Sequence, residues 1–271
     1  MKRALWSAAS GMIAQQTNVD TISNNIANVN TTGYKTEKTE FKSLLYQNLQ
    51  ARTTTANGAN KPIPAQVGLG TRVASNTSMF TQGAMLASES DTAFAIDGEG
   101  FFAVRGADGN TYYTRNGNFT WSIGNDGVIL TNSDGYPVLD SRGNMIRKPD
   151  GVAAEKVSVT SQGQFYYRDA QGNPVDMNQS IGLFQFNNPA GLEKMQDSLL
   201  RVTDASGNPM NEATAAGLDR SNVRQGYLEG SNVQVADEMV NLIIAQRAYE
   251  LNSKAIQASD DMLSQANQLR R

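Results

Sequence analysis

The sequence predicts an α+β protein whose two ends form helices and whose middle folds as an antiparallel β domain. Apolar residues recur at helical spacing near both ends, whereas the middle alternates short β-branched or aromatic runs with Asp-Gly and Asn-Gly turns. These patterns differ because helical faces repeat every 3.6 residues and strand faces every second residue. With 271 residues, the chain is long enough for domains with their own cores.

Residues 1–46 are predicted to form a helix that packs along another helix. Steps of three and four residues separate the members of its stripe, which are Leu5, Ala8, Met12, Gln15, Val19, Ile22, Ile26 and Val29. This heptad spacing is typical of helices in coiled coils. The alternative is that the stripe covers the core of a globular domain, as amphipathic helices commonly do.

Four asparagines, Asn24, Asn25, Asn28 and Asn30, lie near the end of this helix. Each costs about 0.5 to 0.7 kcal/mol of helix stability relative to Ala. We therefore expect the helix to form only when it finds a partner, with Asn24, Asn25 and Asn28 making polar contacts between helices or subunits. Gly33 is expected to end the helix. The alternative is that these asparagines mark a frayed helix end in a monomer.

Residues 47–67 are predicted to be an extended connector. The segment has no apolar period and is rich in Thr, Asn, Gly and Pro. Pro62 and Pro64 favour a stiff, extended path over a helix.

Residues 68–226 are predicted to form the antiparallel β domain. Its β-branched and aromatic runs cover residues 93–104, 111–121, 127–140, 156–167 and 181–189. Turn signals separate the runs at Asp108-Gly109, Asn116-Gly117, Asp126-Gly127, Asp134-Gly135 and Gly163. Asp-Gly and Asn-Gly favour hairpins because both residues tolerate positive φ.

Residues 227–271 are predicted to form a second long helix with an apolar stripe. A repeat of seven residues joins Val235, Leu242, Tyr249, Ile256 and Leu263, with Ile244, Leu251 and Ala258 alongside. We expect this stripe to pack against another helix, or to cover the core of a globular domain. Gln246 and Arg247 are expected to add polar contacts.

The composition excludes several kinds of chemistry. The chain has no Cys and no His, which removes thiol chemistry and the commonest general base and metal ligand. A formal net charge of −3 without a Lys/Arg cluster argues against binding nucleic acid or anionic membranes. No segment approaches the roughly 20 apolar residues that span a bilayer. We therefore expect no cofactor, no metal, no nucleic-acid partner and no membrane insertion.

Two patterns suggest a metal site or a catalytic site, and each has a simpler explanation. The Asp-Gly turns suggest calcium loops, but the distal Glu and flanking helices of an EF-hand are missing. Paired carboxylates of a glycoside hydrolase are suggested by Glu89, Asp91, Asp97 and Glu99. Acids in a predicted loop and strand are more often solvated turn positions, so no catalytic residue is assigned.

Four segments resemble the signature segments of the bacterial flagellar rod and hook proteins, and they occur in that family's order. They are ANVNTTGYK (27–35), IDGEGFFAV (96–104), YTRNGNF (113–119) and the stretch from EGSNVQVADEMV to ASDDML (229–263). The length, LLYQ (44–47) and VGLGTRV (67–73) are similar to the distal rod subtype. Proximal rod proteins and hook-type proteins of the same family are the alternatives.

The resemblance implies an axial structural subunit without enzyme activity. Its terminal helices would pair in an inner coiled-coil domain around a channel, with the β domain outside. The implied partners are other copies in a helical homopolymer, neighbouring rod and hook proteins, the bushing-ring proteins and the flagellar type III export apparatus. Export by that apparatus needs no cleaved signal, and the apolar run in MKRALWSAAS is too short for one.

Two functions from other classes stay open on the sequence alone. One is an exported cell-wall hydrolase that uses the acids near residue 90. The other is a β-sandwich binding module with helical tails.

Overall fold

The computed structural model describes residues 2–50, 65–124, 127–149, 151–169, 171–215 and 217–269. These residues form two compact units. The first unit combines parts of 1–27, 37–78 and 234–271, and the second combines 28–36 and 79–233. The chain therefore crosses between the units four times, after residues 27, 36, 78 and 233.

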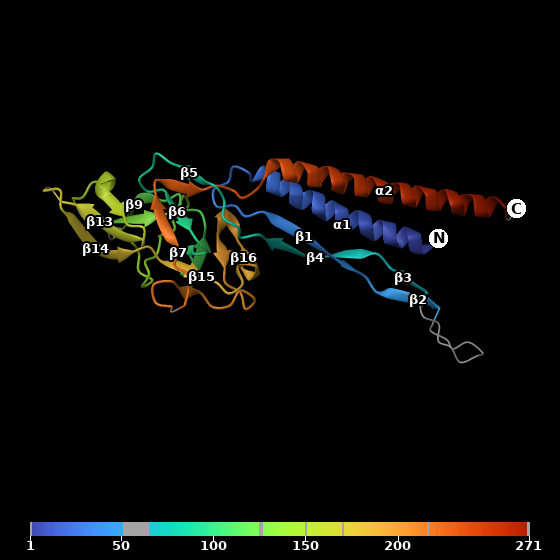
Figure 1. The fold of residues 1–271 in the computed structure, drawn as a ribbon, viewed down its shortest axis with the longest axis horizontal. Coiled ribbons are helices and arrows are strands. Elements are labelled where there is room, and N and C mark those ends of the chain that lie inside the picture. The colour runs from blue at the N-terminus through green and yellow to red at the C-terminus, as the bar shows by residue number, and fades with distance from the viewer. Residues whose placement is uncertain are drawn as a thin grey trace. The chain divides into compact units, whose positions relative to one another are not determined.

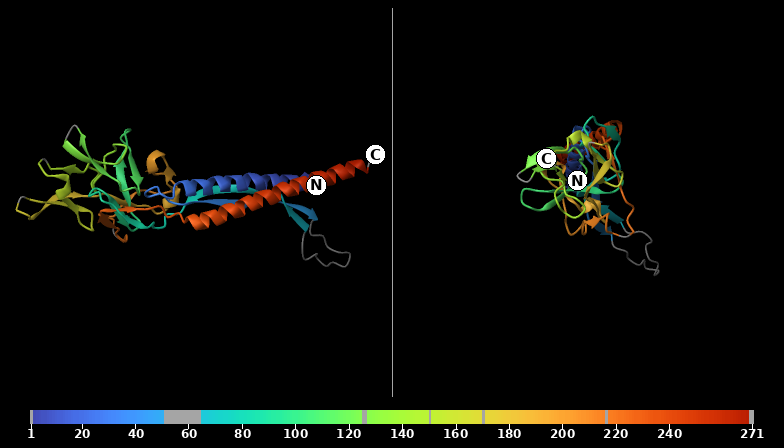
Figure 2. Two further views of the ribbon diagram at one scale, coloured as in Figure 1. Left: turned by 90° about the horizontal axis from the view of Figure 1, so that it is seen from above. Right: turned by 90° about the vertical axis from the view of Figure 1, so that its left-hand side faces the viewer.

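Two long helices belong to the first unit, α1 (Lys2–Ala27) and α2 (Val235–Gln268). Figures 1 and 2 show them side by side, with the start of α1 and the end of α2 at the same end of the pair. The two helices are thus antiparallel. Together with the antiparallel strands described below, they confirm the predicted α+β class. No helix in the described ranges is long and apolar enough to cross a membrane.

The predicted helix through residue 46 is wrong, because α1 ends at Ala27. Turns follow, in which Thr31 N–H donates to Asn28 O (3.2 Å) and Thr31 Oγ1 to Asn28 Oδ1 (3.0 Å). Gly33, with φ +71°, lies beyond the helix and shapes this turn instead of ending the helix. From residue 37 the chain is extended, since Thr39 and Phe41 favour strand over helix.

Two antiparallel ladders complete the first unit. Strand β1 (Glu37–Ser43) pairs with β4 (Thr71–Ser78), and β2 (Tyr46–Gln50) pairs with β3 (Ala65–Gly68). β1 and β4 both contact α1, as Figure 1 shows. The expected connector 47–67 therefore begins and ends in strands. Residues 51–64, with Pro62 and Pro64, lie outside the described residues.

The second unit consists mainly of short antiparallel strands. Their bounds are β5 (Met85–Ala87), β6 (Phe94–Asp97), β7 (Phe101–Arg105), β8 (Thr111–Thr114), β9 (Thr120–Gly124), β10 (Gly127–Thr131), β11 (Arg147–Lys148), β12 (Val157–Val159), β13 (Gln164–Arg168), β14 (Pro174–Ser180), β15 (Leu183–Gln185), β16 (Glu193–Lys194), β17 (Leu200–Arg201), β18 (Met210–Asn211), β19 (Asn222–Gln225) and β20 (Tyr227–Glu229). The largest sheet has the order β16-β17-β8-β7-β15-β18. Smaller sheets are β9-β10-β11, β12-β13-β14, β6-β19 and β5-β20.

Two apolar clusters fill this unit, and residues of β7 point alternately into one and the other. The larger one contains Phe94, Phe102, Phe119 and Phe165, all 2% exposed or less. The smaller one is built around Phe101, with Tyr113 and Phe186 against it. T-shaped ring contacts such as Phe102–Phe119, 5.1 Å between centroids, add to the burial of apolar area.

The turn predictions were mostly correct. Asp108-Gly109 joins the paired strands β7 and β8, and the glycine has φ +80°. Asn116-Gly117 is the exception, because it lies between β8 and β9, which do not pair with each other. A side chain at Gly117 would collide with Phe94 O, so this glycine serves close packing. Asp126 lies outside the described residues.

The expected boundaries at 68 and 226–227 also differ from the structure. β4 belongs to the first unit, whereas the second unit extends through β20 to Val233, and α2 begins only at Val235. The second unit also includes residues 28–36. These short segments carry no apolar period, so their place becomes visible only through the contacts described next.

Candidate functional site

The antiparallel helix pair brings distant residues together along its length. A methyl group added at Gly11 would lie 2.9 Å from Asn252 Nδ2, which shows a close approach of α1 to α2. Farther along, Asn25 Nδ2 donates to Glu238 Oε2 (3.3 Å). The small side chain of Ala245 is also buried here, at 1% exposure. Small and polar residues thus allow the helices to lie near one another.

The predicted stripe residues are only partly covered. Ile22 is buried, and half-buried positions are Leu5, Met12, Val19, Ile26, Leu242, Ile256 and Leu263. Tyr249 is 43% exposed, and Gln246 and Arg247 are exposed. One partner helix covers only one flank of a stripe, so much of each side chain remains open to a further neighbour. The role of these residues in assembly stays a prediction.

A second apolar face on α2 was missed as a separate surface. Its members, which are 51% to 66% exposed, are Val240, Ile244, Leu251 and Met262. Ile244, Leu251 and Met262 follow Val240 by 4, 11 and 22 residues, all near whole numbers of turns. The sequence reading placed Ile244 and Leu251 alongside the heptad stripe. The segment contains more apolar residues than one heptad stripe can hold, and this excess could have indicated a second apolar face.

An exposed apolar pair on α1 was also missed. Trp6 is 75% exposed and Ile13 is 66% exposed. They lie seven residues apart and therefore on one face of the helix. We use "outer faces" for these two residues together with Val240, Ile244, Leu251 and Met262.

A groove of about 400 Å³ lies along the helix pair. It is lined by Gln16 and Val19 of α1 and by Gln246, Tyr249 and Glu250 of α2. Glu250 also forms an exposed ion pair with Arg247, 2.8 Å between Oε2 and Nη1. Three residues that the sequence analysis selected, Val19, Gln246 and Tyr249, therefore meet at this groove.

Asn25 has the most definite role among the asparagines. Its side chain is 1% exposed and bridges three elements. Asn25 Nδ2 donates to Glu37 O (2.8 Å) as well as to Glu238, while Oδ1 accepts from Glu37 N–H (2.9 Å). Asn25 thus satisfies both backbone groups of Glu37 where β1 begins. Asn24 is exposed, and Asn28 lies in the turn after α1.

The second unit contains a buried ion cluster of Lys35, Arg115 and Glu229. Lys35 Nζ lies 2.6 Å from Glu229 Oε1, and Arg115 Nη1 lies 3.5 Å from Glu229 Oε2. The three side chains are 3%, 3% and 0% exposed. Burial lowers the pKa of Lys35, although Glu229 beside it acts in the opposite direction. Sequence reasoning did not find this cluster.

The ion cluster joins three of the segments that carry the family resemblance. Lys35 ends ANVNTTGYK, Arg115 lies in YTRNGNF and Glu229 begins EGSNV. Gly33 N–H also donates to Glu229 O (2.8 Å). The signature segments are therefore joined in the second unit by charge pairing and backbone bonding.

Asn232 extends this junction by a few residues. Its Oδ1 accepts from Thr36 N–H and Thr36 Oγ1, both at 2.8 Å. Its Nδ2 donates to Met79 O (2.8 Å) and to Thr81 Oγ1 (2.7 Å). One amide side chain thus links three separate segments of the second unit.

The acids near residue 90 lie at or near the surface. Asp97 Oδ2 accepts from Arg224 Nη2 (2.8 Å) in an exposed ion pair. Glu89, Asp91 and Glu99 are exposed. Within the described ranges, no group of three or more Asp or Glu residues is arranged to hold a metal ion.

Comparison with known proteins shows which family shares the segments described above. Three family models match the chain: "Flagella basal body rod protein" at residues 5–35, "Flagellar hook protein FlgE/F/G D1 domain" at 95–167 and "Flagellar basal body rod FlgEFG protein C-terminal" at 224–269. Together they cover both helices and much of the second unit. They define the class of flagellar axial proteins.

Full-length relatives narrow this class. The flagellar basal-body rod protein FlgG of Borreliella burgdorferi is 43% identical, and the match covers 100% of both chains. FlgG of Agrobacterium fabrum is 41% identical over 97% of both chains, and FlgG of Bacillus subtilis is 36% identical over 100% of both. The chain belongs to the flagellar basal-body rod protein family. That family consists of structural proteins of the flagellar basal body.

Proposed function

We propose that this chain is the distal-rod subunit of the flagellar basal body and polymerises into a hollow helical drive shaft that transmits torque. The main support is its full-length similarity to FlgG proteins from several bacteria. The outer faces on α1 and α2 supply apolar area for contacts between copies. No catalytic role is part of this proposal.

The exposed apolar residues give assembly its energetic basis. A Leu or Ile side chain contributes about 1.5 to 3 kcal/mol when it becomes fully buried. Several such residues on each chain favour helix packing between copies, while the half-buried stripe residues Leu242, Ile256 and Leu263 add further area. The groove at Val19, Gln246 and Tyr249 offers a recess for a neighbour's side chain.

The proposed partners follow the family. They are other copies of this chain, neighbouring rod and hook proteins, and the bushing-ring proteins. The type III export apparatus would deliver the chain unfolded through the central channel, without removing a signal peptide. Mass spectrometry of the subunit from purified basal bodies tests the last point, because a shortened N-terminus would contradict it.

Leu251→Asp tests assembly because Leu251 is 66% exposed in the single chain. We expect the variant to unfold at the wild-type temperature yet to form no filaments and restore no motility. Gln257→Asp, which adds the same charge at another exposed position of α2, is the control and should assemble. Electron microscopy of the concentrated chain and motility of a complemented deletion strain are the measurements. Normal assembly of Leu251→Asp would refute a role for this face.

A further inference from the structure

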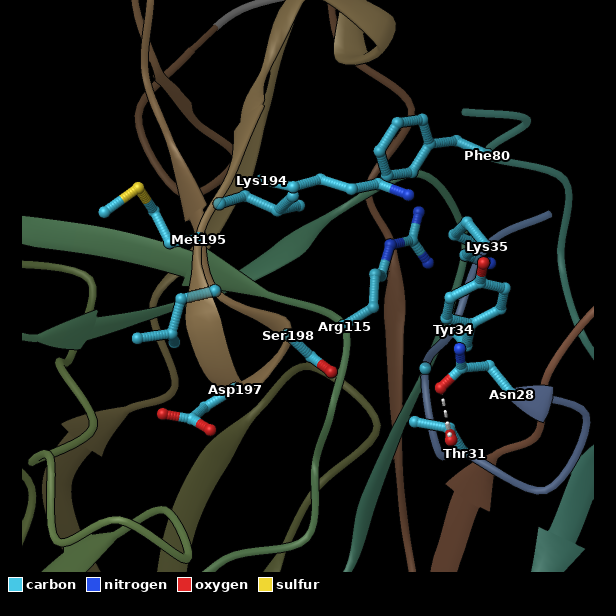
Figure 3. A pocket seen from close by; sticks show the side chains of 13 residues that line it. Asn28, Thr31, Tyr34, Lys35, Phe80, Arg115, Lys194, Met195, Asp197 and Ser198 are labelled. Carbon is cyan, nitrogen blue, oxygen red and sulfur yellow. Dashed lines mark hydrogen bonds between the residues drawn. The ribbon is translucent and has the colours of Figure 1, made fainter. Parts of the chain in front are cut away.

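A pocket of about 310 Å³ lies in the second unit next to the buried ion cluster (Figure 3). Its lining residues come from four parts of the chain, which are residues 28–35, Phe80, Arg115 and residues 194–200. The outer faces and the helix groove share no residue with it. The pocket therefore needs its own explanation.

Arg115 provides the main evidence for a ligand. Its side chain is 3% exposed, and among the described residues only Nη1 forms hydrogen bonds, to Gly98 O (2.9 Å) and Glu229 Oε2 (3.5 Å). Arg115 Nε is buried and has no hydrogen-bond partner in the part of the chain that the structure describes. Buried N–H groups are nearly always paired, and an unpaired one costs stability. The guanidinium group thus retains capacity for another acceptor.

The surroundings of Arg115 favour a negative charge. Glu229 is shared between Arg115 and Lys35, so one carboxylate faces two buried cations. Glu212 and Glu99 also attract Arg115. Glu99 is exposed to solvent, and the oxygens of Glu212 already accept hydrogen bonds from Gln185 and Ser221. A third cation, Lys194, lines the pocket.

The remaining walls favour an apolar group beside that charge. Phe80, Met195, Leu199 and Leu200 line the pocket. Among the described residues that line the pocket, Asp197 is the one acid. It is exposed, and in Figure 3 its carboxylate points away from Arg115.

The backbone of one wall is held in an unfavourable conformation. Asp197 and Ser198 both have φ of 60°, in the left-handed region that residues other than Gly rarely adopt. Such backbone positions cluster at ligand sites. They are a second indication, independent of Arg115, that this wall has a function.

We propose that the pocket binds a carboxylate carried on an apolar group, with Arg115 and Lys194 holding the charge. A planar guanidinium matches a carboxylate in geometry. Phosphate fits less well, because its more strongly hydrated charge would face Phe80 and the leucines. A free organic acid and an Asp or Glu side chain on an apolar segment of another polypeptide offer the same chemistry.

Benzoate is a suitable probe for the full-length, unassembled chain. We expect saturable changes in the nitrogen and proton NMR signals of Arg115 Nε on adding benzoate. Benzamide, which has the same shape without the charge, should cause no such change. Equal responses to both compounds, or tighter binding of inorganic phosphate, would overturn the proposal.

Matched variants locate the site. Lys194→Met should weaken benzoate binding by about tenfold through the loss of one charged contact. Lys156→Met removes a charge from another exposed lysine of the same unit and should leave the affinity unchanged. Arg115→Lys, which keeps the charge near Glu229 but removes Nε, should also weaken binding. Unchanged affinity in Lys194→Met would overturn the assignment even where Arg115→Lys does not fold.

Sedimentation tests whether a second copy of this chain supplies the carboxylate. Weaker self-association of Lys194→Met than of Lys156→Met would support a carboxylate supplied by a second copy. Unchanged self-association together with weaker benzoate binding would support a carboxylate from a free acid or from another polypeptide. The benzoate measurement uses single chains, so its outcome is independent of whether the chain forms a rod.

Discussion

Lys35 Nζ lies 2.6 Å from Glu229 Oε1, although 194 residues separate the two in sequence and neither side chain reaches solvent. Two buried cations depend on this one carboxylate, since Arg115 also pairs with it. Desolvation of charges is costly, so a buried cluster is sensitive to the loss of any member.

Glu229→Gln should destabilise the second unit by about 3 to 5 kcal/mol, because Lys35 and Arg115 would then be buried without the carboxylate that pairs with both of them. Urea unfolding followed by tryptophan fluorescence measures this loss. Glu193→Gln removes an acid from the exposed pair with Arg201 and should cost less than about 1 kcal/mol. Similar losses in both variants would show that the buried cluster is not special.

Asn25→Ala should weaken the first unit by about 2 to 3 kcal/mol. The change removes the buried hydrogen bonds from Asn25 to Glu37 N–H and Glu37 O, and also the contact to Glu238. Thermal melting of helical circular dichroism is the measurement. Asn24→Ala alters an exposed neighbour and should change stability by less than about 0.7 kcal/mol. If both variants change the melting temperature equally, the hydrogen bonds of Asn25 contribute no more to stability than helix propensity does.

Gly33→Ala should destabilise the second unit more than Gly109→Ala. Both glycines have positive φ, +71° and +80°. A Cβ at Gly33 would lie 2.8 Å from the backbone carbon of Arg115, whereas Gly109 has open space. The control should lose about 1 kcal/mol from backbone strain alone. Equal urea midpoints for the two variants would mean that the packing at Gly33 relaxes without cost.

Tyr113 should make stability depend on alkaline pH. Burial raises the pKa of Tyr113 to about 12 in the folded chain, against about 10 in the unfolded chain. Above pH 10 the unfolded state therefore loses its proton first, and up to about 2 kcal/mol of stability should disappear between pH 10 and 12. Urea unfolding at pH 9 and 11 checks this. In Tyr113→Phe the alkaline loss should be smaller, and an identical loss would contradict the assignment.

The sequence patterns predicted the fold class, most strands and most hairpin turns because those features depend on local periodicity and turn chemistry. The end of α1 was predicted too late, since residues such as Lys38 and Lys42 permit helix as well as strand. The heptad spacing selected Leu242 and Ile256 as the assembly residues, but the structure shows that both are half-buried. Leu251, which is more exposed, was only placed alongside them. Periodicity shows which apolar residues share a face of the helix. The position of the partner helix decides which of these faces stays exposed.

The ion cluster could not have been predicted from one sequence. Lys35, Arg115 and Glu229 lie in polar segments without periodicity, and nothing local indicates that they meet. Their burial depends on segments from both ends of the chain entering one unit. Arg115 and Glu229 read individually as ordinary exposed charges.

The side chain of Asn232 has a mechanical consequence. Three of the four places where the chain passes between units lie at or next to the segments that this amide joins, namely Thr36, Met79 and Asn232 itself. A force that acts on any one of these three segments is therefore transmitted to the other two through the hydrogen bonds of Asn232. Separating one segment requires breaking its hydrogen bonds to Asn232, so we expect these bonds to oppose unfolding of the second unit that starts where the chain enters or leaves it.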